Sequence, residues 1–117
     1  MRMRKKPNLI PRLEACGGSV ITDARERKGR WRELMPEAEE LHLELGCGKG
    51  RFTVGTAQAH PETLFIAVER VPDAMVIAAE RARELGLTNV FFIDADAAEV
   101  REYFAPGEVD RIYINFC

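Results

Sequence analysis

One stretch, residues 41–50, constrains the fold of this chain more than any other. It reads Leu-His-Leu-Glu-Leu-Gly-Cys-Gly-Lys-Gly, a short apolar run that stops at three glycines spaced two apart. A different pattern begins at Arg51, so the sequence predicts a buried strand, a tight turn and the start of a helix. Glycine is needed where φ is positive or where a side chain would hold the backbone away from a ligand. The stretch therefore predicts a nucleotide-binding turn, with the amides of the helix start facing the ligand.

The spacing of the glycines narrows the kind of nucleotide. A dinucleotide fingerprint needs a small residue three places after its second glycine, where this chain has Arg51. A P-loop needs a glycine five places before its Gly-Lys pair, where this chain has Leu43. The carboxylate of Glu44 would repel a pyrophosphate but suits a ligand with an amino group. A glycine turn without any ligand is the alternative. The candidate ligand-binding glycines are Gly46, Gly48 and Gly50.

Strands and helices alternate after this turn. Apolar runs predict strands at 41–45, 64–69, 90–93 and 109–116, and helices lie between them at 51–60, 73–85 and 98–104. The second run is apolar almost throughout, as expected for a parallel strand that is covered on both faces. The alternation predicts an α/β fold with a doubly wound parallel sheet. The last strand is expected to form an exposed apolar edge.

The charge of the chain is unevenly distributed. Residues 1–32 hold ten Lys and Arg against three acids, and the remainder holds seven against sixteen. Proline and glycine predict an extended or partly ordered segment over 1–23, and a short basic helix is expected over 24–35. Trp31 on this helix is expected to pack in the core, with stacking on a base as the alternative. We therefore expect a basic arm with a short helix, 1–35, followed by a nucleotide-binding domain, 36–117. The arm is suited to phosphate contacts, but a solvated tail explains its charge equally well.

The composition argues against membrane and secreted proteins. No apolar run approaches the roughly 20 residues of a membrane span, and no apolar segment of signal-peptide length follows the basic start. The three cysteines are too scattered for a disulfide framework or a zinc site. We expect a cytoplasmic protein without a membrane partner, of undetermined oligomeric state.

Acidic residues stand at the carboxyl ends of three predicted strands, where open α/β sheets bind ligands. Glu44 ends the first strand, and Glu69 ends the second at a distance typical of an acid that accepts hydrogen bonds from ribose hydroxyls. Asp96 follows the third strand, where it can meet an adenine amino group, with the amide of Ala97 near a ring nitrogen. Asp94 fits the same role from the sequence pattern alone.

Four runs together carry a specific family resemblance. Residues 1–7, 28–34, 42–52 and 110–116 resemble the bacterial tRNA (guanine-N7-)-methyltransferase, a class I S-adenosylmethionine-dependent methyltransferase. The resemblance implies a Rossmann-like fold, S-adenosylmethionine as cofactor and a guanine N7 of the tRNA variable loop as methyl acceptor. It places cofactor carboxylates at Glu44, Glu69 and Asp96, which favours Asp96 over Asp94. It also places the basic arm near tRNA. The candidate tRNA contacts in that arm are Arg2, Arg4, Lys5 and Lys6.

The chain departs from the family pattern after its last predicted strand. In the family, Asn-Phe is followed by a small residue and then Asp-Pro-Trp-Pro-Lys, whereas this sequence reaches Cys117 one residue before that motif. We therefore expect this chain to be the cofactor-binding part of the enzyme, with the sheet truncated after its fourth predicted strand. We predict no catalytic residue in it. The alternatives are a non-catalytic tRNA- or partner-binding chain and an NAD-dependent oxidoreductase domain, which Arg51 and Glu44 disfavour.

Overall fold

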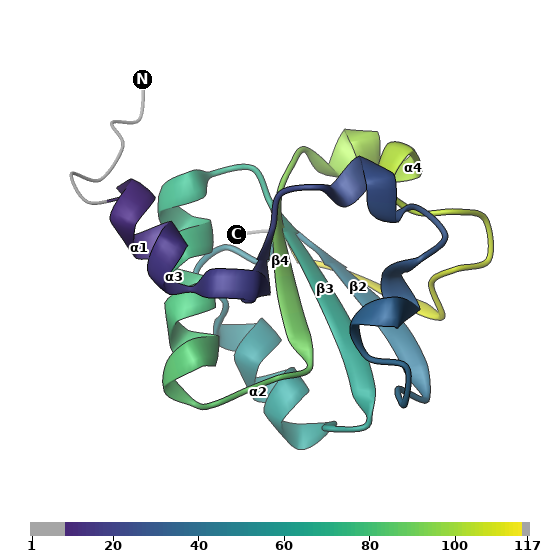
Figure 1. Ribbon diagram of the computed structural model, residues 1–117, viewed down its shortest axis with the longest axis horizontal. Coiled ribbons are helices and arrows are strands. Elements are labelled where there is room, and N and C mark those ends of the chain that lie inside the picture. Colours follow the sequence, from purple (N-terminus) through teal and green to yellow (C-terminus); the bar gives the residue numbers. More distant parts are fainter. Residues whose placement is uncertain (1–8, 116–117) are drawn as a thin grey trace.

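The computed structural model describes residues 9–115 and contains one parallel five-stranded sheet (Figure 1). The strand order is β1-β4-β3-β2-β5, and every neighbouring pair is parallel. The sheet confirms the expected α/β class. The strands are β1 Val20–Ile21, β2 Glu40–Leu45, β3 Thr63–Glu69, β4 Val90–Asp94 and β5 Arg111–Ile114.

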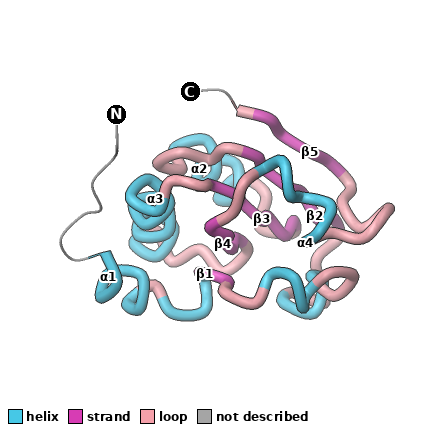
Figure 2. Tube along the Cα trace, turned by 90° about the horizontal axis from the view of Figure 1, so that it is seen from above, coloured by secondary structure: helices cyan, strands magenta, loops and turns pink. Residues whose placement is uncertain are grey.

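Helices cover both faces of the sheet, as Figure 2 shows from above. Helices α1, α2 and α3 lie on one face, and α4 lies on the other with two 3-10 turns, η2 and η3. The α-helices are α1 Leu9–Ala15, α2 Arg51–Ala59, α3 Pro72–Glu84 and α4 Val100–Tyr103. The 3-10 helices are η1 Gly17–Ser19, η2 Ala24–Arg27, η3 Trp31–Leu34 and η4 Ala97–Glu99.

Strand β3 shows why the sheet needs both layers. Leu64 and Ile66 belong to the core cluster beneath η3 and α4, whereas Phe65 and Ala67 belong to the cluster beneath α2 and α3. All four side chains are at most 2% exposed. Because successive residues of a strand point to opposite faces, an almost continuous apolar run is stable only when both faces are covered. The expected burial of this strand is therefore confirmed.

The amino-terminal segment differs from the sequence-based expectation. Residues 9–15 form α1 rather than extended chain, and the two residues of β1 pair with β4 and add an unexpected strand. The helix expected over 24–35 is wrong, because η2 and η3 are separate 3-10 turns. Gly29 lies between the two turns with a φ of 80°, a left-handed conformation that interrupts a right-handed helix.

Trp31 fixes this segment to the sheet. Its side chain is fully buried, and the ring stacks on Phe104 with centroids 5.1 Å apart. The indole Nε1–H donates a 2.7 Å hydrogen bond to the carbonyl oxygen of Tyr103. A large aromatic ring with its polar atom satisfied is a core residue. The expected core position is confirmed, and stacking of Trp31 on a base is excluded.

Strand β5 forms one edge of the sheet, next to β2. It begins at Arg111 rather than at the expected residue 109, and Phe116 at the expected end lies outside the described residues. Ile112 and Ile114 are 53% and 58% exposed, so the expected exposed apolar edge is confirmed. Among residues 9–115, no helix has both the length and the apolar character needed to cross a membrane.

Candidate functional site: a crevice at the carboxyl ends of the strands

The chain reverses its direction across the sheet at β2. From β2 it proceeds to β3 and β4 on one side, and β5 then pairs with the opposite side of β2. In doubly wound sheets, this switch point opens a crevice beyond the carboxyl ends of the strands, where ligands bind. The glycine turn, residues 46–50, lies directly at this position.

The backbone of the glycine turn approaches its neighbours too closely for side chains. Gly46, Gly48 and Gly50 all have positive φ, between 55° and 81°. A Cβ atom on Gly46 would lie 2.8 Å from the carbonyl oxygen of Asn115. A Cβ atom on Gly50 would lie 2.5 Å from the Cβ of Ala78, so this glycine allows α2 to pack against α3. The turn is therefore shaped by glycine both at the crevice and beneath it.

A cavity of about 820 Å³ opens beside the turn, a size typical of small-molecule sites. Carboxylates and glycine backbone line its interior, and exposed cations and a ring lie at its surface. The expected site residues that line it are Glu44, Gly46, Gly48, Gly50 and Glu69.

Glu44 is the buried carboxylate of this cavity, with 2% of its surface exposed. Its Oε1 accepts a hydrogen bond from the Thr53 hydroxyl, and its Oε2 accepts one from the Asn115 side-chain amide. Burial raises the pKa of Glu44, the two hydrogen bonds oppose that rise, and the nearby charge of Glu69 adds to it. Each carboxylate oxygen keeps a further lone pair, so Glu44 can still accept from an ammonium group.

Glu69 lies between the glycine turn and the loop before α3. Its Oε1 accepts a 2.8 Å hydrogen bond from the amide of Gly48, and its Oε2 accepts a 3.1 Å bond from the amide of Val71. These bonds fix the carboxylate within the crevice, with lone pairs left for ligand hydroxyls. Glu69 is partly exposed, unlike Glu44.

A second hollow of about 490 Å³ continues the crevice toward β4. It shares Gly46, Glu69 and Asn115 with the first cavity, and Asp96 and Ala97 line its far side. The Oδ1 atom of Asp96 accepts a 2.9 Å hydrogen bond from the amide of Ala98, which fixes the carboxylate at the start of η4. The structure therefore brings all seven expected cofactor residues to one continuous crevice.

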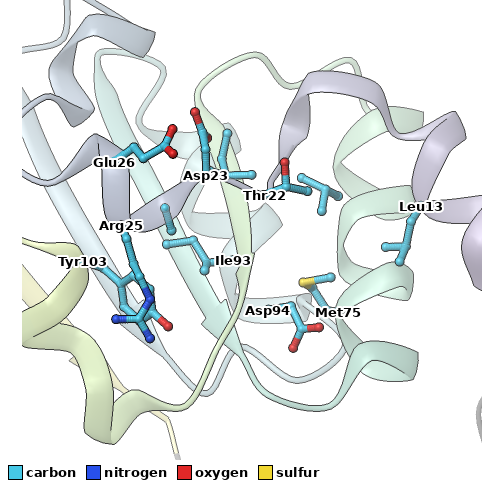
Figure 3. A pocket seen from close by; sticks show the side chains of 12 residues that line it. Leu13, Thr22, Asp23, Arg25, Glu26, Met75, Ile93, Asp94 and Tyr103 are labelled. Atoms are coloured by element: carbon cyan, nitrogen blue, oxygen red, sulfur yellow. The ribbon is translucent and has the colours of Figure 1, made fainter.

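Asp94, the alternative to Asp96, lies in a different place. It lines a separate cavity of about 480 Å³ near β1, together with Met75 on α3 and Arg25 on η2 (Figure 3). Asp94 is the last residue of β4, and Asp96 follows two residues later at the turn into η4. The geometry favours Asp96 as the residue that faces a ligand bound at Glu69.

Two residues of the site were missed by sequence reasoning. Thr53 on α2 and Asn115 after β5 both donate hydrogen bonds to Glu44, and both bonds depend on how these elements pack around β2. A hydroxyl three residues after the last glycine gives no signal in the sequence. The polar Asn115 directly after an apolar strand at the switch point was the available signal, because that position borders the crevice.

The basic arm is only partly within the described residues. Arg2, Arg4, Lys5 and Lys6 lie outside them, so the structure gives no placement for these candidates. All five arginines in residues 9–32 form ion pairs with acids of the chain. Their positive charge is therefore compensated locally and gives little support for phosphate binding. The pairs are Arg12–Glu80, Arg25–Glu102, Arg27–Asp23, Arg30–Glu33 and Arg32–Asp110.

Solved structures with this fold define its class. The antibiotic-resistance methyltransferase Kmr is 25% identical, with a TM-score of 0.66 over 82% of this chain and 49% of its own. A 16S rRNA adenine-N1 methyltransferase from Catenulisporales acidiphilia, solved with its cosubstrate SAM, is 23% identical; its TM-score is 0.56 over 80% of this chain and 45% of its own. The fold is that of class I S-adenosylmethionine-dependent methyltransferases, which confirms the expected Rossmann-like fold.

Sequence relatives narrow this class. A protein-family model described as "Putative methyltransferase" matches residues 38–117, and the chain belongs to this methyltransferase family. The tRNA (guanine-N(7)-)-methyltransferase of Geobacillus kaustophilus is 42% identical over 99% of this chain, which corresponds to 54% of that relative. The chain thus spans about half the length of the curated relatives it matches. The expected resemblance to this group of enzymes is confirmed.

Proposed function

We propose that the chain binds S-adenosylmethionine in the strand-end crevice and is the cofactor-binding part of an enzyme that methylates guanine N7 in tRNA. The observation that carries this proposal is the pair of carboxylates, Glu44 and Glu69, on either side of a glycine turn. Glu44 would accept hydrogen bonds from the cofactor's ammonium group, and Glu69 from its ribose hydroxyls. Asp96 and the Ala97 amide would meet the adenine edge.

The buried carboxylate of Glu44 argues against a dinucleotide. The buried acid beside the turn would repel a pyrophosphate. Arg51 also occupies the position where a dinucleotide fingerprint needs a small residue. S-adenosylmethionine carries an ammonium and a sulfonium but no phosphate, so it suits the charge of this crevice.

The proposed chemistry asks little of the protein beyond positioning. When bound, S-adenosylmethionine supplies an electrophilic methyl group on its sulfonium. Guanine N7 has a lone pair and no proton, so no residue is needed to deprotonate it. Holding the two reactants in line is the main contribution expected from the protein. We therefore assign no general base among the described residues.

The proposal extends to the parts of the chain and its partner. We infer that residues 36–117 form the cofactor-binding unit and that residues 1–35 form an arm on the tRNA side. Arg2, Arg4, Lys5 and Lys6 would contact tRNA phosphates, and a tRNA substrate implies a cytoplasmic location. The support is the 42% identity to a tRNA (guanine-N(7)-)-methyltransferase over nearly the whole chain.

Methyl transfer to defined transcripts tests this function. The protein expressed from its complete gene is incubated with methyl-labelled S-adenosylmethionine and an unmodified tRNA transcript. We expect label in the guanosine-containing transcript and none in a matched transcript that carries 7-deazaguanosine, which lacks N7. Equal labelling of the two transcripts would refute N7 as the acceptor.

A further inference from the structure

An exposed aromatic ring lies at the mouth of the cofactor cavity. Phe52, the second residue of α2, is 43% exposed and lines the cavity beside the glycine turn. Its ring packs against Tyr113 on the edge strand β5, with centroids 5.3 Å apart and the planes tilted by 59°. Trp31, Phe65 and Phe92 are by contrast almost fully buried. Phe52 therefore presents an aromatic face where a second reactant must enter.

Two cations precede this ring in the sequence. Lys49 and Arg51 are exposed, line the same cavity, and form no ion pair with any residue in 9–115. The guanidinium of Arg81 also lines the cavity and donates a 3.2 Å hydrogen bond to the Lys49 carbonyl oxygen. These charges differ from the arginines of residues 9–32, which are all ion-paired. Lys49 and Arg51 therefore place uncompensated positive charge at the cavity mouth.

The crevice thus combines two opposite electrostatic environments. Its interior holds the carboxylates of Glu44 and Glu69, which suit a cationic cofactor. Its mouth holds free cations around an aromatic face. A nucleotide within an RNA strand has the complementary pair of features, because its base has a π-face and its phosphates are anionic. A protein or lipid partner would not need an aromatic ring beside unpaired cations at a cofactor site.

We propose that Phe52, Lys49 and Arg51 form the docking site for the RNA nucleotide that accepts the methyl group. The ring of Phe52 stacks on the acceptor base, and the two cations bind the phosphates that flank it. The base must leave its stack to reach the cofactor, and an aromatic side chain offers a replacement stack. This inference rests on the proposed function, since it assigns the acceptor side of the same crevice.

Binding measurements on single variants test the docking site. The affinity for an unmodified tRNA transcript is measured with S-adenosylhomocysteine present, and the affinity for S-adenosylmethionine is measured separately by calorimetry. Phe52→Ala is expected to weaken tRNA binding by about 5- to 150-fold, the effect of losing one base–aromatic stack. Phe52→Trp keeps an aromatic ring and should bind tRNA about as tightly as the unmodified protein does. The matched control is Leu85→Ala, directly after α3, which removes a side chain of similar exposure (48%) away from the cavity.

The cations give an independent readout. The double variant Lys49→Ala, Arg51→Ala should lower the slope of log affinity against log salt by about 1.4, since each phosphate contact on a single strand contributes about 0.7. Arg83→Ala, an exposed cation on the far part of α3, is the control and should leave the slope unchanged. Both variants alter exposed side chains, and circular dichroism is used to check that they remain folded.

The outcomes separate this inference from the proposed function. If the unmodified protein fails to bind S-adenosylmethionine, the proposed function is wrong. If it binds both ligands and the Phe52 and cation variants bind tRNA normally, the docking site alone is wrong. If Lys49 and Arg51 are needed for S-adenosylmethionine rather than for tRNA, the cations hold the cofactor carboxylate and the docking site is again overturned.

Discussion

Replacing Glu44 by glutamine separates the binding role of this carboxylate from any structural role. Glutamine has nearly the same shape, and its oxygen can accept the hydrogen bond from Thr53 that Glu44 accepts now. Rotation of the Asn115 amide presents its oxygen to the new NH₂ group, so the second hydrogen bond is also preserved. The substitution therefore removes the negative charge and little else.

The loss of charge has opposite effects on binding and on stability. A hydrogen bond to a charged group contributes about 1.5–3 kcal/mol, so the variant should bind S-adenosylmethionine about 10- to 150-fold more weakly. The folded state of the unmodified protein disfavours the carboxylate, because burial raises the pKa of Glu44. At neutral pH, the free energy of unfolding of the Glu44→Gln variant should consequently be equal to or higher than that of the unmodified protein.

The raised pKa also fixes the sign of the pH dependence. A carboxyl with a higher pKa in the folded state binds its proton more tightly there, so stability decreases as pH rises from 4.5 through the folded-state value. Affinity for the cofactor changes in the opposite direction, because only the carboxylate can pair with an ammonium. It should weaken as pH falls through the same raised pKa. Glu44→Gln should abolish this dependence.

Calorimetric titration with S-adenosylmethionine over a series of pH values, combined with chemical denaturation, measures both effects. Glu84→Gln, an exposed acid at the end of α3, is the control and should change neither affinity nor stability. The reasoning is refuted if Glu44→Gln binds the cofactor as tightly as the unmodified protein. It is also refuted if the variant unfolds more easily, because Glu44 would then be structural.

Three further predictions concern stability, measured by chemical denaturation. Gly50→Ala should cost at least about 1–2 kcal/mol, because its φ is positive and Ala78 is in the way, whereas Gly55→Ala within the same helix should stabilise by about 0.5–1 kcal/mol. Trp31→Ala should cost about 3–5 kcal/mol, since the ring is fully buried; Trp31→Phe should cost less. Asn89→Ala should cost about 1–3 kcal/mol, because the two N–H groups of its Nδ2 are shared among three carbonyl oxygens, each 3.0 Å away.

Each of these predictions has an outcome that contradicts it. Equal effects of alanine at Gly50 and Gly55 would mean that close packing against α3 does not require glycine. A mild effect of Trp31→Ala would mean that residues 9–35 are not anchored through this ring. A neutral Asn89→Ala would mean that water satisfies the three carbonyl oxygens after the side chain is removed.

The strands were predictable because their apolar runs have a single stable environment. The run 64–69 contains no polar residue before Glu69, so it must lie in a sheet covered on both faces. The glycine turn was also predictable, because three glycines spaced two apart at the end of such a run indicate a tight turn. The carboxylate at Glu69 followed from its position at the end of a strand.

The amino-terminal segment was not predictable from local pattern. Residues 24–35 carry helix-forming side chains, yet tertiary contacts decide their conformation. Trp31 packs under Tyr103 and Phe104, more than seventy positions later in the sequence. The two residues of β1 are too few to give a periodic signal, and their partners on β4, Phe92 and Ile93, are distant in the sequence.

Side-chain partners across the sheet could also not be predicted from the sequence. Glu44 pairs in register with Tyr113, which places Asn115 two residues further along at the crevice. That register depends on the complete sheet and cannot be read from either strand alone. Some arginines of residues 9–32 form ion pairs with acids that are distant in the sequence, such as Glu80 and Asp110. The charge count suggested a free basic arm because it cannot show these pairs.

Calorimetric titration of the chain with S-adenosylmethionine, and in parallel with NADH, tests the central claim most directly. The account predicts saturable 1:1 binding of S-adenosylmethionine and no binding of NADH, because Glu44 favours an ammonium and would repel a pyrophosphate. Tighter binding of NADH would contradict the account and would make the strand-end crevice a dinucleotide site.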